Sequence, residues 1–157
     1  MSNETPFIRG IKFLQANALF GGFTEKDLEA VLPLMEEESF KEGDYIIREG
    51  ETGDRLHFIE KGRVDVTKDT KDGETLLTTL GPGDEFGEME LIDIRPRSAT
   101  VRAVEEVVTL SLTNRNLLRL YHNDVEIFAR LVLNLAREVS RRFRKAEERW
   151  FGDEEAT

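Results

Sequence analysis

The sequence predicts an α+β, mainly β fold: an antiparallel β roll, similar to a jelly-roll barrel, flanked by N-terminal helices and a long C-terminal helix. Short alternating apolar runs separated by glycine turns fill the middle of the chain, which is typical of antiparallel strands. On both sides of that region the apolar residues recur at helical spacing instead. A chain of 157 residues without cysteine is long enough to bury a core without disulfides.

These observations predict one domain followed by a short tail. The domain is expected over residues 1–151, with N-terminal helices in 1–34, the β roll in 35–112 and C-terminal helices in 113–151. The acidic tail, residues 152–157, has the composition of a disordered segment.

The N-terminal segment is predicted to be helical as far as about Leu34. Its apolar residues recur at near-helical spacing; they are Phe7, Ile8, Ile11, Leu14 and Leu19. The run Thr24-Glu25-Lys26-Asp27 resembles a capping box, in which a hydroxyl and a carboxylate satisfy free N–H groups at the start of a helix. Pro33 predicts that this helix ends close by, because proline cannot donate the helical hydrogen bond.

Six strands are expected in the β roll. They are Tyr45–Ile47, Leu56–Ile59, Val64–Val66, Leu76–Leu80, Val101–Ala103 and Val108–Leu112. The segments between them contain glycine, which adopts the positive φ of tight turns at no steric cost. Strands at this spacing predict a compact barrel or jelly roll that closes its own edges.

A long helix is predicted from about Asp124, a candidate cap, to Arg149. Its apolar stripe consists of Val125, Phe128, Leu131, Val132, Leu135 and Val139, and continues through Phe143, Ala146 and Trp150. Basic residues crowd its second half, and their simplest interpretation is a solvated face with pairs such as Glu138 with Arg142. A helix this long is not stable alone in water, so it should dock on the roll or pair with a second copy. We therefore expect a homodimer with Leu135 and Val139 near its axis.

The composition argues against several functions. Lys and Arg number 22 against 32 Asp and Glu, a net charge of −10 that disfavours specific DNA binding, because the phosphate backbone repels an acidic chain. The absence of cysteine excludes disulfides, a thiol nucleophile and cysteine-ligated zinc. No apolar run reaches the ~18 residues of a membrane span and no signal-peptide pattern is present, so we expect a cytoplasmic protein without membrane contact.

Catalysis and a metal site are not expected. The two histidines, His57 and His122, are too few and too far apart in sequence for a metal-dependent barrel enzyme, and His57 is interpreted as a strand residue. No Ser-His-Asp arrangement with a recognisable spacing is present. We therefore predict no metal and no resident cofactor.

The most informative segment, residues 81–101, interrupts the strand pattern. A glycine-led turn that enters a short helical turn directs free backbone N–H groups outward, and these favour a bound anion such as phosphate. Arg97 can pair two phosphate oxygens through its planar guanidinium. Glu88, at the start of the same turn, can accept a hydrogen bond from a sugar hydroxyl. The alternative for Glu88 and Arg97 is a buried ion pair of structural importance only.

Two runs in this segment resemble the phosphate-binding cassette of the cyclic nucleotide-binding domain family: Phe86-Gly87-Glu88-x-x-Leu91, and Pro96-Arg97-Ser98-Ala99-Thr100-Val101. The family includes protein kinase A regulatory subunits and the bacterial catabolite activator. The resemblance extends to the turn glycines and covers roughly residues 15–145.

The resemblance implies a role for each site residue. Glu88 would accept the ribose 2′-hydroxyl, and Arg97 would neutralise the cyclic phosphate. The other ligand-binding residues that it implies are Phe86, Gly87, Met89, Leu91, Ser98, Ala99 and Arg142. Two residues depart from the family pattern: Glu90 adds a carboxylate before Leu91, and Arg142 stands where the bacterial activator reads adenine with a hydroxyl. Ser98 is compatible with either cyclic AMP or cyclic GMP.

The resemblance therefore implies a binding module and not an enzyme. It would sense cyclic AMP or cyclic GMP and signal through its C-terminal helix to a downstream protein that the sequence does not identify. The alternative is an interaction or scaffold domain of the same fold that has lost ligand binding.

Overall fold

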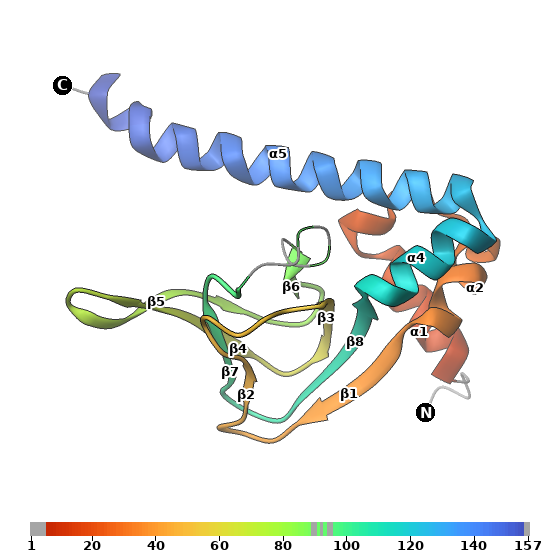
Figure 1. Ribbon diagram of the computed structural model, residues 1–157, viewed down its shortest axis with the longest axis horizontal. Coiled ribbons are helices and arrows are strands. Elements are labelled where there is room, and N and C mark those ends of the chain that lie inside the picture. The colour runs from red at the N-terminus through yellow and green to blue at the C-terminus, as the bar shows by residue number, and fades with distance from the viewer. Residues whose placement is uncertain (1–5, 89–90, 92, 94–95, 156–157) are drawn as a thin grey trace.

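Two β sheets lie below a long helix, with shorter helices gathered at one end (Figure 1). The computed structural model describes residues 6–88, 91, 93 and 96–155. The N-terminal helices are α1 (Pro6–Gln15) and α2 (Glu25–Val31), with 3₁₀ turns η1 (Ala18–Phe20) and η2 (Leu32–Leu34). The capping box is confirmed, because the Asp27 N–H donates to the Thr24 hydroxyl at 3.1 Å and the Thr24 N–H donates to the Asp27 carboxylate at 3.0 Å.

The sheets confirm the antiparallel β roll. One sheet has the order β1 (Glu36–Phe40), β8 (Val107–Thr113), β3 (Arg55–Lys61), β6 (Glu85–Phe86); the other has the order β2 (Tyr45–Ile47), β7 (Thr100–Ala103), β4 (Val64–Thr70), β5 (Gly73–Leu80). All six expected strands are present. The two sheets stay separate, so the expectation of a barrel that closes its own edges is wrong.

Two strands, β1 and β6, are not among those that the sequence predicts. β1 is an acidic and largely exposed segment, yet it pairs with β8 along its whole length, from Glu36 opposite Ser111 to Phe40 opposite Val107. β6 has only two residues, which pair with His57 and Phe58 of β3. An apolar alternation cannot reveal a strand that is charged or this short.

Two apolar cores hold the chain together. The larger one joins the N-terminal helices, α4 (Asn114–Asn123), α5 (Val125–Glu155) and the inner side of β3 and β8, and includes Leu14, Phe20 and Phe58. The smaller one lies between the sheets and consists of Ile47, Ile59, Val64, Phe86, Val101, Ala103 and Val107. Phe86 therefore anchors the start of the cassette in the smaller core.

The long helix α5 begins as expected and ends later than expected. The Asp124 carboxylate accepts a hydrogen bond from the Ile127 N–H at 3.1 Å, which confirms the cap. The helix continues to Glu155, so the expectation that the acidic tail is disordered from Gly152 onward is corrected for four of its residues.

Only one face of α5 packs on its own domain. Ile127, Leu131 and Leu135 are buried there, and the Asn134 side chain donates to the carbonyls of Leu19 and Gly21 at 3.0 Å each. Leu135 is 2% exposed, so its expected place near a dimer axis is wrong.

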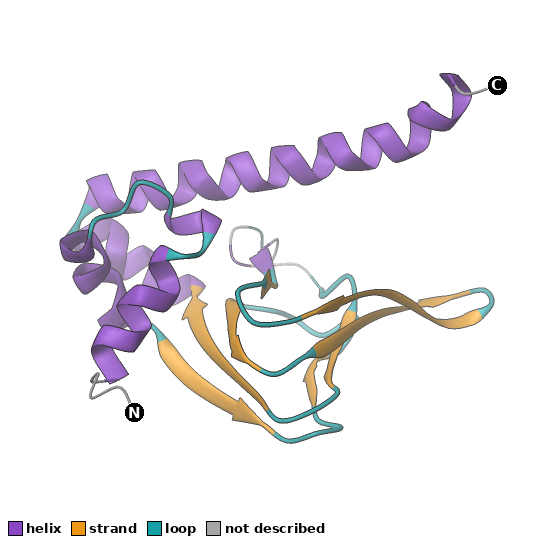
Figure 2. Ribbon diagram, turned by 180° about the vertical axis from the view of Figure 1, so that it is seen from behind, coloured by secondary structure: helices purple, strands orange, loops and turns teal. Residues whose placement is uncertain are grey.

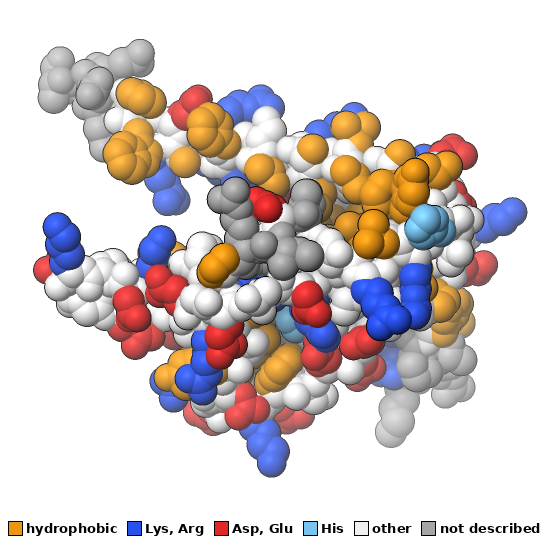
Figure 3. All heavy atoms as spheres, in the orientation of Figure 1, with side chains coloured by type: hydrophobic (Ala, Val, Ile, Leu, Met, Phe, Trp, Pro, Cys, Tyr) orange, Lys and Arg blue, Asp and Glu red, His pale blue; other side chains and the backbone are white. Residues whose placement is uncertain are grey.

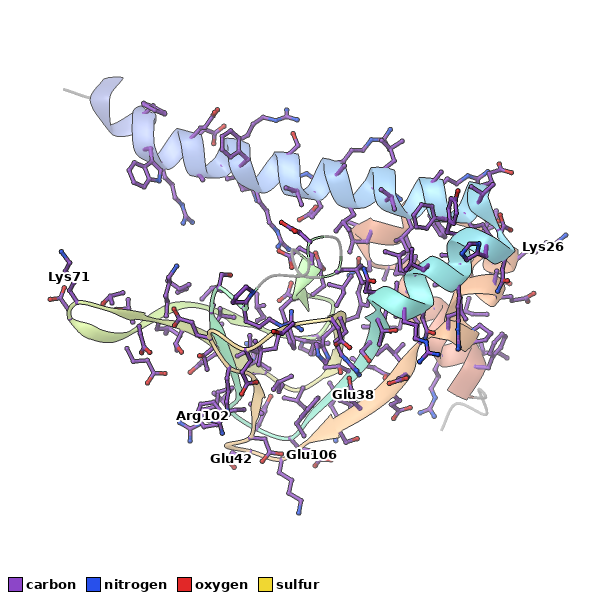
Figure 4. The ribbon with its side chains drawn as sticks, viewed as in Figure 1. Lys26, Glu38, Glu42, Lys71, Arg102 and Glu106 are labelled. Carbon is purple, nitrogen blue, oxygen red and sulfur yellow. The ribbon has the colours of Figure 1, made fainter. Side chains whose placement is uncertain are left out.

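The second half of α5 extends beyond the helical end of the molecule and over the β4–β5 hairpin, as both ribbon views show (Figures 1 and 2). Lys71 marks the hairpin tip (Figure 4). A hollow separates the hairpin from this part of the helix (Figure 3). None of the helices in the described part of the chain is long and apolar enough to span a membrane.

Candidate functional site

Arg97 is fixed at both its backbone and its side chain. Its N–H donates to the Glu51 carbonyl at 2.7 Å, and its own carbonyl accepts from the Gly50 N–H at 2.9 Å. The residue is only 7% exposed, and Nη2 donates to the Arg55 carbonyl at 3.1 Å. The loop before β3 therefore fixes the Arg97 backbone, and the first residue of β3 holds the guanidinium.

Two glycines leave the space that the Arg97 side chain occupies. A Cβ atom on Gly53 would overlap Nε and Cζ of Arg97. A Cβ on Gly87 would lie 2.7 Å from Arg97 Nη1 and 2.8 Å from the Arg55 carbonyl oxygen, and the φ of Gly87 is +87°. Contacts this short cannot be accommodated without movement, so both positions require glycine. We call Gly53, Gly87, Arg97, Ser98 and Ala99 the Arg97 cradle.

A pocket of about 520 Å³ opens between the cradle and α5. Its lining includes most of the site residues expected from the sequence: Phe86, Gly87, Glu88, Arg97, Ser98, Ala99 and Arg142. Leu91 is not in the lining; its side chain is buried in the larger core and its carbonyl accepts from the Asn114 side chain at 2.6 Å. Met89 and Glu90 lie outside the described residues.

His57 lies against the cradle as a neutral side chain. Its ring stacks on Phe86 with centroids 4.9 Å apart, and Nδ1 is 3.1 Å from the Thr109 hydroxyl. Burial, reinforced by the Arg97 charge, lowers the pKa of His57 to about 3. Glu38 on β1 brings a carboxylate oxygen to 3.6 Å from Nδ1 (Figure 4). The histidine is therefore uncharged at neutral pH, beside the charged Arg97 and Arg55.

Glu88 pairs with Arg142 across the pocket. Arg142 Nη2 also lies 3.0 Å from Glu85, and its Nε lies 3.4 Å from Glu138, which confirms the expected pair between Glu138 and Arg142. Three carboxylates thus surround one guanidinium. The proposed sugar acceptor and the long helix are joined by a charge-assisted contact.

Glu85 connects this cluster to the N-terminal helices. Its carboxylate accepts from the Asn17 side chain at 3.1 Å, and Asn17 also donates to the Gly83 carbonyl. Burial raises the pKa of Glu85, and the hydrogen bond from Asn17 and the Arg142 charge oppose that rise. Asn17 in turn caps η1, which α5 contacts through Asn134.

Sequence reasoning missed the apolar wall of the pocket, Glu85, and two cations that line the pocket from α5, Lys145 and Arg149. The basic composition of this half of the helix predicts only a solvated face for Lys145 and Arg149. Their spacing from Arg142, three and seven residues, places all three on one side of a helix, and this was the available signal. We call Arg142, Lys145 and Arg149 the α5 roof. Among the described residues, no group of three or more His, Asp or Glu is placed to hold a metal ion.

Comparison with known proteins identifies the family to which this arrangement corresponds. Residues 37–124 match the family model described as the cyclic nucleotide-binding domain. The chain is 34% identical over 115 residues to the cAMP-dependent protein kinase regulatory subunit of Debaryomyces hansenii, which covers 73% of this chain and 25% of that protein. It is 38% identical over 105 residues to human cGMP-dependent protein kinase 2, which covers 66% of this chain and 14% of that protein.

A solved structure shows the same fold. The catabolite activator protein of Thermus thermophilus superimposes with a TM-score of 0.78 and 30% identity, over 85% of this chain and 62% of that one. The chain thus spans between 14% and 62% of the length of these three proteins. The relatives are regulators or regulated kinases whose names refer to both cyclic AMP and cyclic GMP.

Proposed function

The chain belongs to the cyclic nucleotide-binding domain family, and we propose that it binds a cyclic purine mononucleotide between the Arg97 cradle and the α5 roof. The observation that carries the proposal is Arg97, a residue that is 7% exposed at the wall of a 520 Å³ pocket. Its guanidinium is held by the Arg55 carbonyl, and two glycines leave room for it. A buried, pre-positioned guanidinium suits a phosphate with two oxygens within reach.

Glu88 supplies the sugar contact in this proposal. Its side chain is 12% exposed and lines the same pocket as Arg97 and Ser98. An ionised carboxylate only accepts hydrogen bonds, so one oxygen can accept a hydrogen bond from a ribose hydroxyl while the other keeps its contact with Arg142. Sugar and phosphate would then be recognised at adjacent points.

Calorimetric titration of the chain with cyclic AMP and cyclic GMP tests the proposal. Arg97→Ala removes the phosphate partner and should weaken binding by about 2–4 kcal/mol, the magnitude of one to two charge-assisted hydrogen bonds. Arg102→Ala is the control, because Arg102 lies on β7 outside the pocket and donates to the Gly43 carbonyl. Absence of heat with both nucleotides at millimolar concentration would leave the alternative, a scaffold domain that has lost its ligand.

Occupancy would be signalled through α5. Arg142 of that helix shares Glu88 with the proposed ribose contact, so the ligand would bind directly beside a contact that joins α5 to the pocket. The same guanidinium reaches Glu85, which Asn17 links to the N-terminal helices. A ligand that binds differently to two positions of α5 would shift the population between them.

The outward face of α5 would carry a homodimer contact. Its apolar residues follow one another at alternating spacings of four and three: Val125, Ala129, Val132, Ala136, Val139, Phe143, Ala146 and Trp150. The largest of them are exposed, Phe143 to 64% and Trp150 to 78%. Figure 3 shows that apolar side chains are exposed along the length of α5. This heptad pattern is typical of a two-helix seam, and a second copy supplies a matching one.

Binding, and not catalysis, is the activity that we propose for this chain. The relatives support a regulatory role, since the matched region belongs to regulatory subunits and regulated proteins. Specific DNA binding is not proposed, because the chain carries a net charge of −10. A gel shift at physiological salt that resists competitor DNA would contradict that statement.

A further inference from the structure

The three cations of the α5 roof differ in what already binds them. Arg142 contacts Glu85, Glu88 and Glu138. Lys145 and Arg149 line the same pocket and form no hydrogen bond or ion pair with any residue that the structure describes. The donors of Arg142 are therefore engaged by protein, whereas those of Lys145 and Arg149 face the pocket without a protein partner.

The opposite wall of the pocket is mostly apolar. It is formed by the sheet of β2, β7, β4 and β5, with Ile47, Val66, Thr78, Leu80 and Val101 in the lining. A flat purine suits the space between such a wall and a helix. The acidic residues of the lining, Glu85 and Glu88, are both bound to Arg142.

A purine edge that faces Lys145 and Arg149 meets donors only. Lysine and arginine side chains have no acceptor. A 6-oxopurine presents two acceptors on that edge, O6 and N7, and this pair is the common target of arginine and lysine. A 6-aminopurine presents a donor at N6 in place of O6, so one cation would face an amino group.

We propose that Lys145 and Arg149 make the pocket selective for a cyclic 6-oxopurine nucleotide over a cyclic 6-aminopurine nucleotide. The proposal rests on the binding function proposed above. It assigns base recognition to two residues on the turns that follow Arg142, because Arg142 itself is held by the three carboxylates.

Titration with three cyclic nucleotides tests this assignment. Cyclic GMP and cyclic IMP both have O6, whereas cyclic AMP has N6; cyclic IMP lacks the 2-amino group and so isolates the effect of O6. One arginine or lysine pair with O6 and N7 discriminates by about 1–3 kcal/mol, so both 6-oxo ligands should bind roughly five- to 150-fold more tightly than cyclic AMP.

The double variant Lys145→Met/Arg149→Met should bind all three ligands with affinities within about threefold of one another. Arg144→Gln is the matched control, because Arg144 lies outside the pocket lining and contacts Ser140; it should keep the wild-type preference. Equal or tighter binding of cyclic AMP by wild type, or a preference that survives in the double variant, overturns the assignment while the binding function stands. Absence of binding by all three ligands overturns the binding function itself.

Discussion

The Arg97 cradle and the α5 roof place arginines on opposite sides of one pocket and hold them in different ways. Arg97 is 7% exposed, and its position follows from a backbone carbonyl and from two glycines that leave it room. The Arg142 side chain is 43% exposed and is held by carboxylates alone. Steric fit does not depend on salt or charge, whereas exposed ion pairs do. The comparison indicates a fixed side of the pocket and a side that can change position.

The largest effect is expected where α5, the helix that carries the roof, packs on the domain. Leu135→Asp places a charge at a position that is 2% exposed and should unfold the chain, since an unpaired buried charge costs several kcal/mol. Val139→Asp changes a residue that is 36% exposed on the outward face, so the fold should survive and the proposed dimer should dissociate. Sedimentation equilibrium with circular dichroism distinguishes the two. A monomeric wild type at tens of micromolar would contradict the dimer.

A smaller effect is expected from substitutions of two glycines, which test whether the Arg97 cradle must hold Arg97 in place. Gly53→Ala forces Arg97 to move and should weaken nucleotide binding by at least about thirtyfold, comparable with 2 kcal/mol from Arg97→Ala. Gly81→Ala is the control, because a Cβ there would meet nothing closer than 3.9 Å. Wild-type affinity in Gly53→Ala, measured by titration, would show that the fixed geometry of the cradle is not needed.

A smaller effect is expected in the pH dependence of folding. The pKa of His57 is about 3 in the folded chain and near 6.5 when unfolded, so below pH 6.5 the unfolded chain takes up a proton that the folded chain does not. The free energy of unfolding should therefore fall by about 1.6 kcal/mol between pH 6.5 and 5 on account of this residue.

Urea unfolding of His57→Gln at the two pH values isolates that contribution. The variant should lose about 1.6 kcal/mol less than wild type over this interval. The control His122→Gln, at an exposed position on α4, should lose as much as wild type. Equal losses in wild type and His57→Gln would mean that His57 takes up its proton without unfolding.

Local chemistry made part of this structure predictable. The capping box at Thr24, the cap at Asp124 and the six apolar strands depend on residues close in sequence, and all are confirmed. The resemblance to the phosphate-binding cassette could likewise be recognised because its residues are close in sequence. The Glu36–Phe40 strand was missed because its pairing with β8 is a long-range contact that leaves no apolar pattern.

Other features depend on which face of an element turns inward, and a single sequence leaves that open. α5 has two apolar stripes, and the periodicity alone could not show that Leu135 lies on the inner one and Val139 on the outer one. Gly53 was interpreted only as a turn residue, because its role depends on Arg97, distant in sequence. Lys145 could not be assigned to the pocket for a comparable reason, because it lines the pocket only where α5 crosses above the β roll.

Amide hydrogen exchange with and without saturating cyclic nucleotide tests the central claim, that a fixed cradle and a responsive roof enclose one ligand. We expect protection to increase at the cradle amides of Gly87, Ser98 and Ala99, and to change along α5 from Glu138 to Arg149 at the same ligand concentration. Increased protection in the cradle with identical exchange along α5 would contradict the claim, because the helix would then neither contact the ligand nor report its presence.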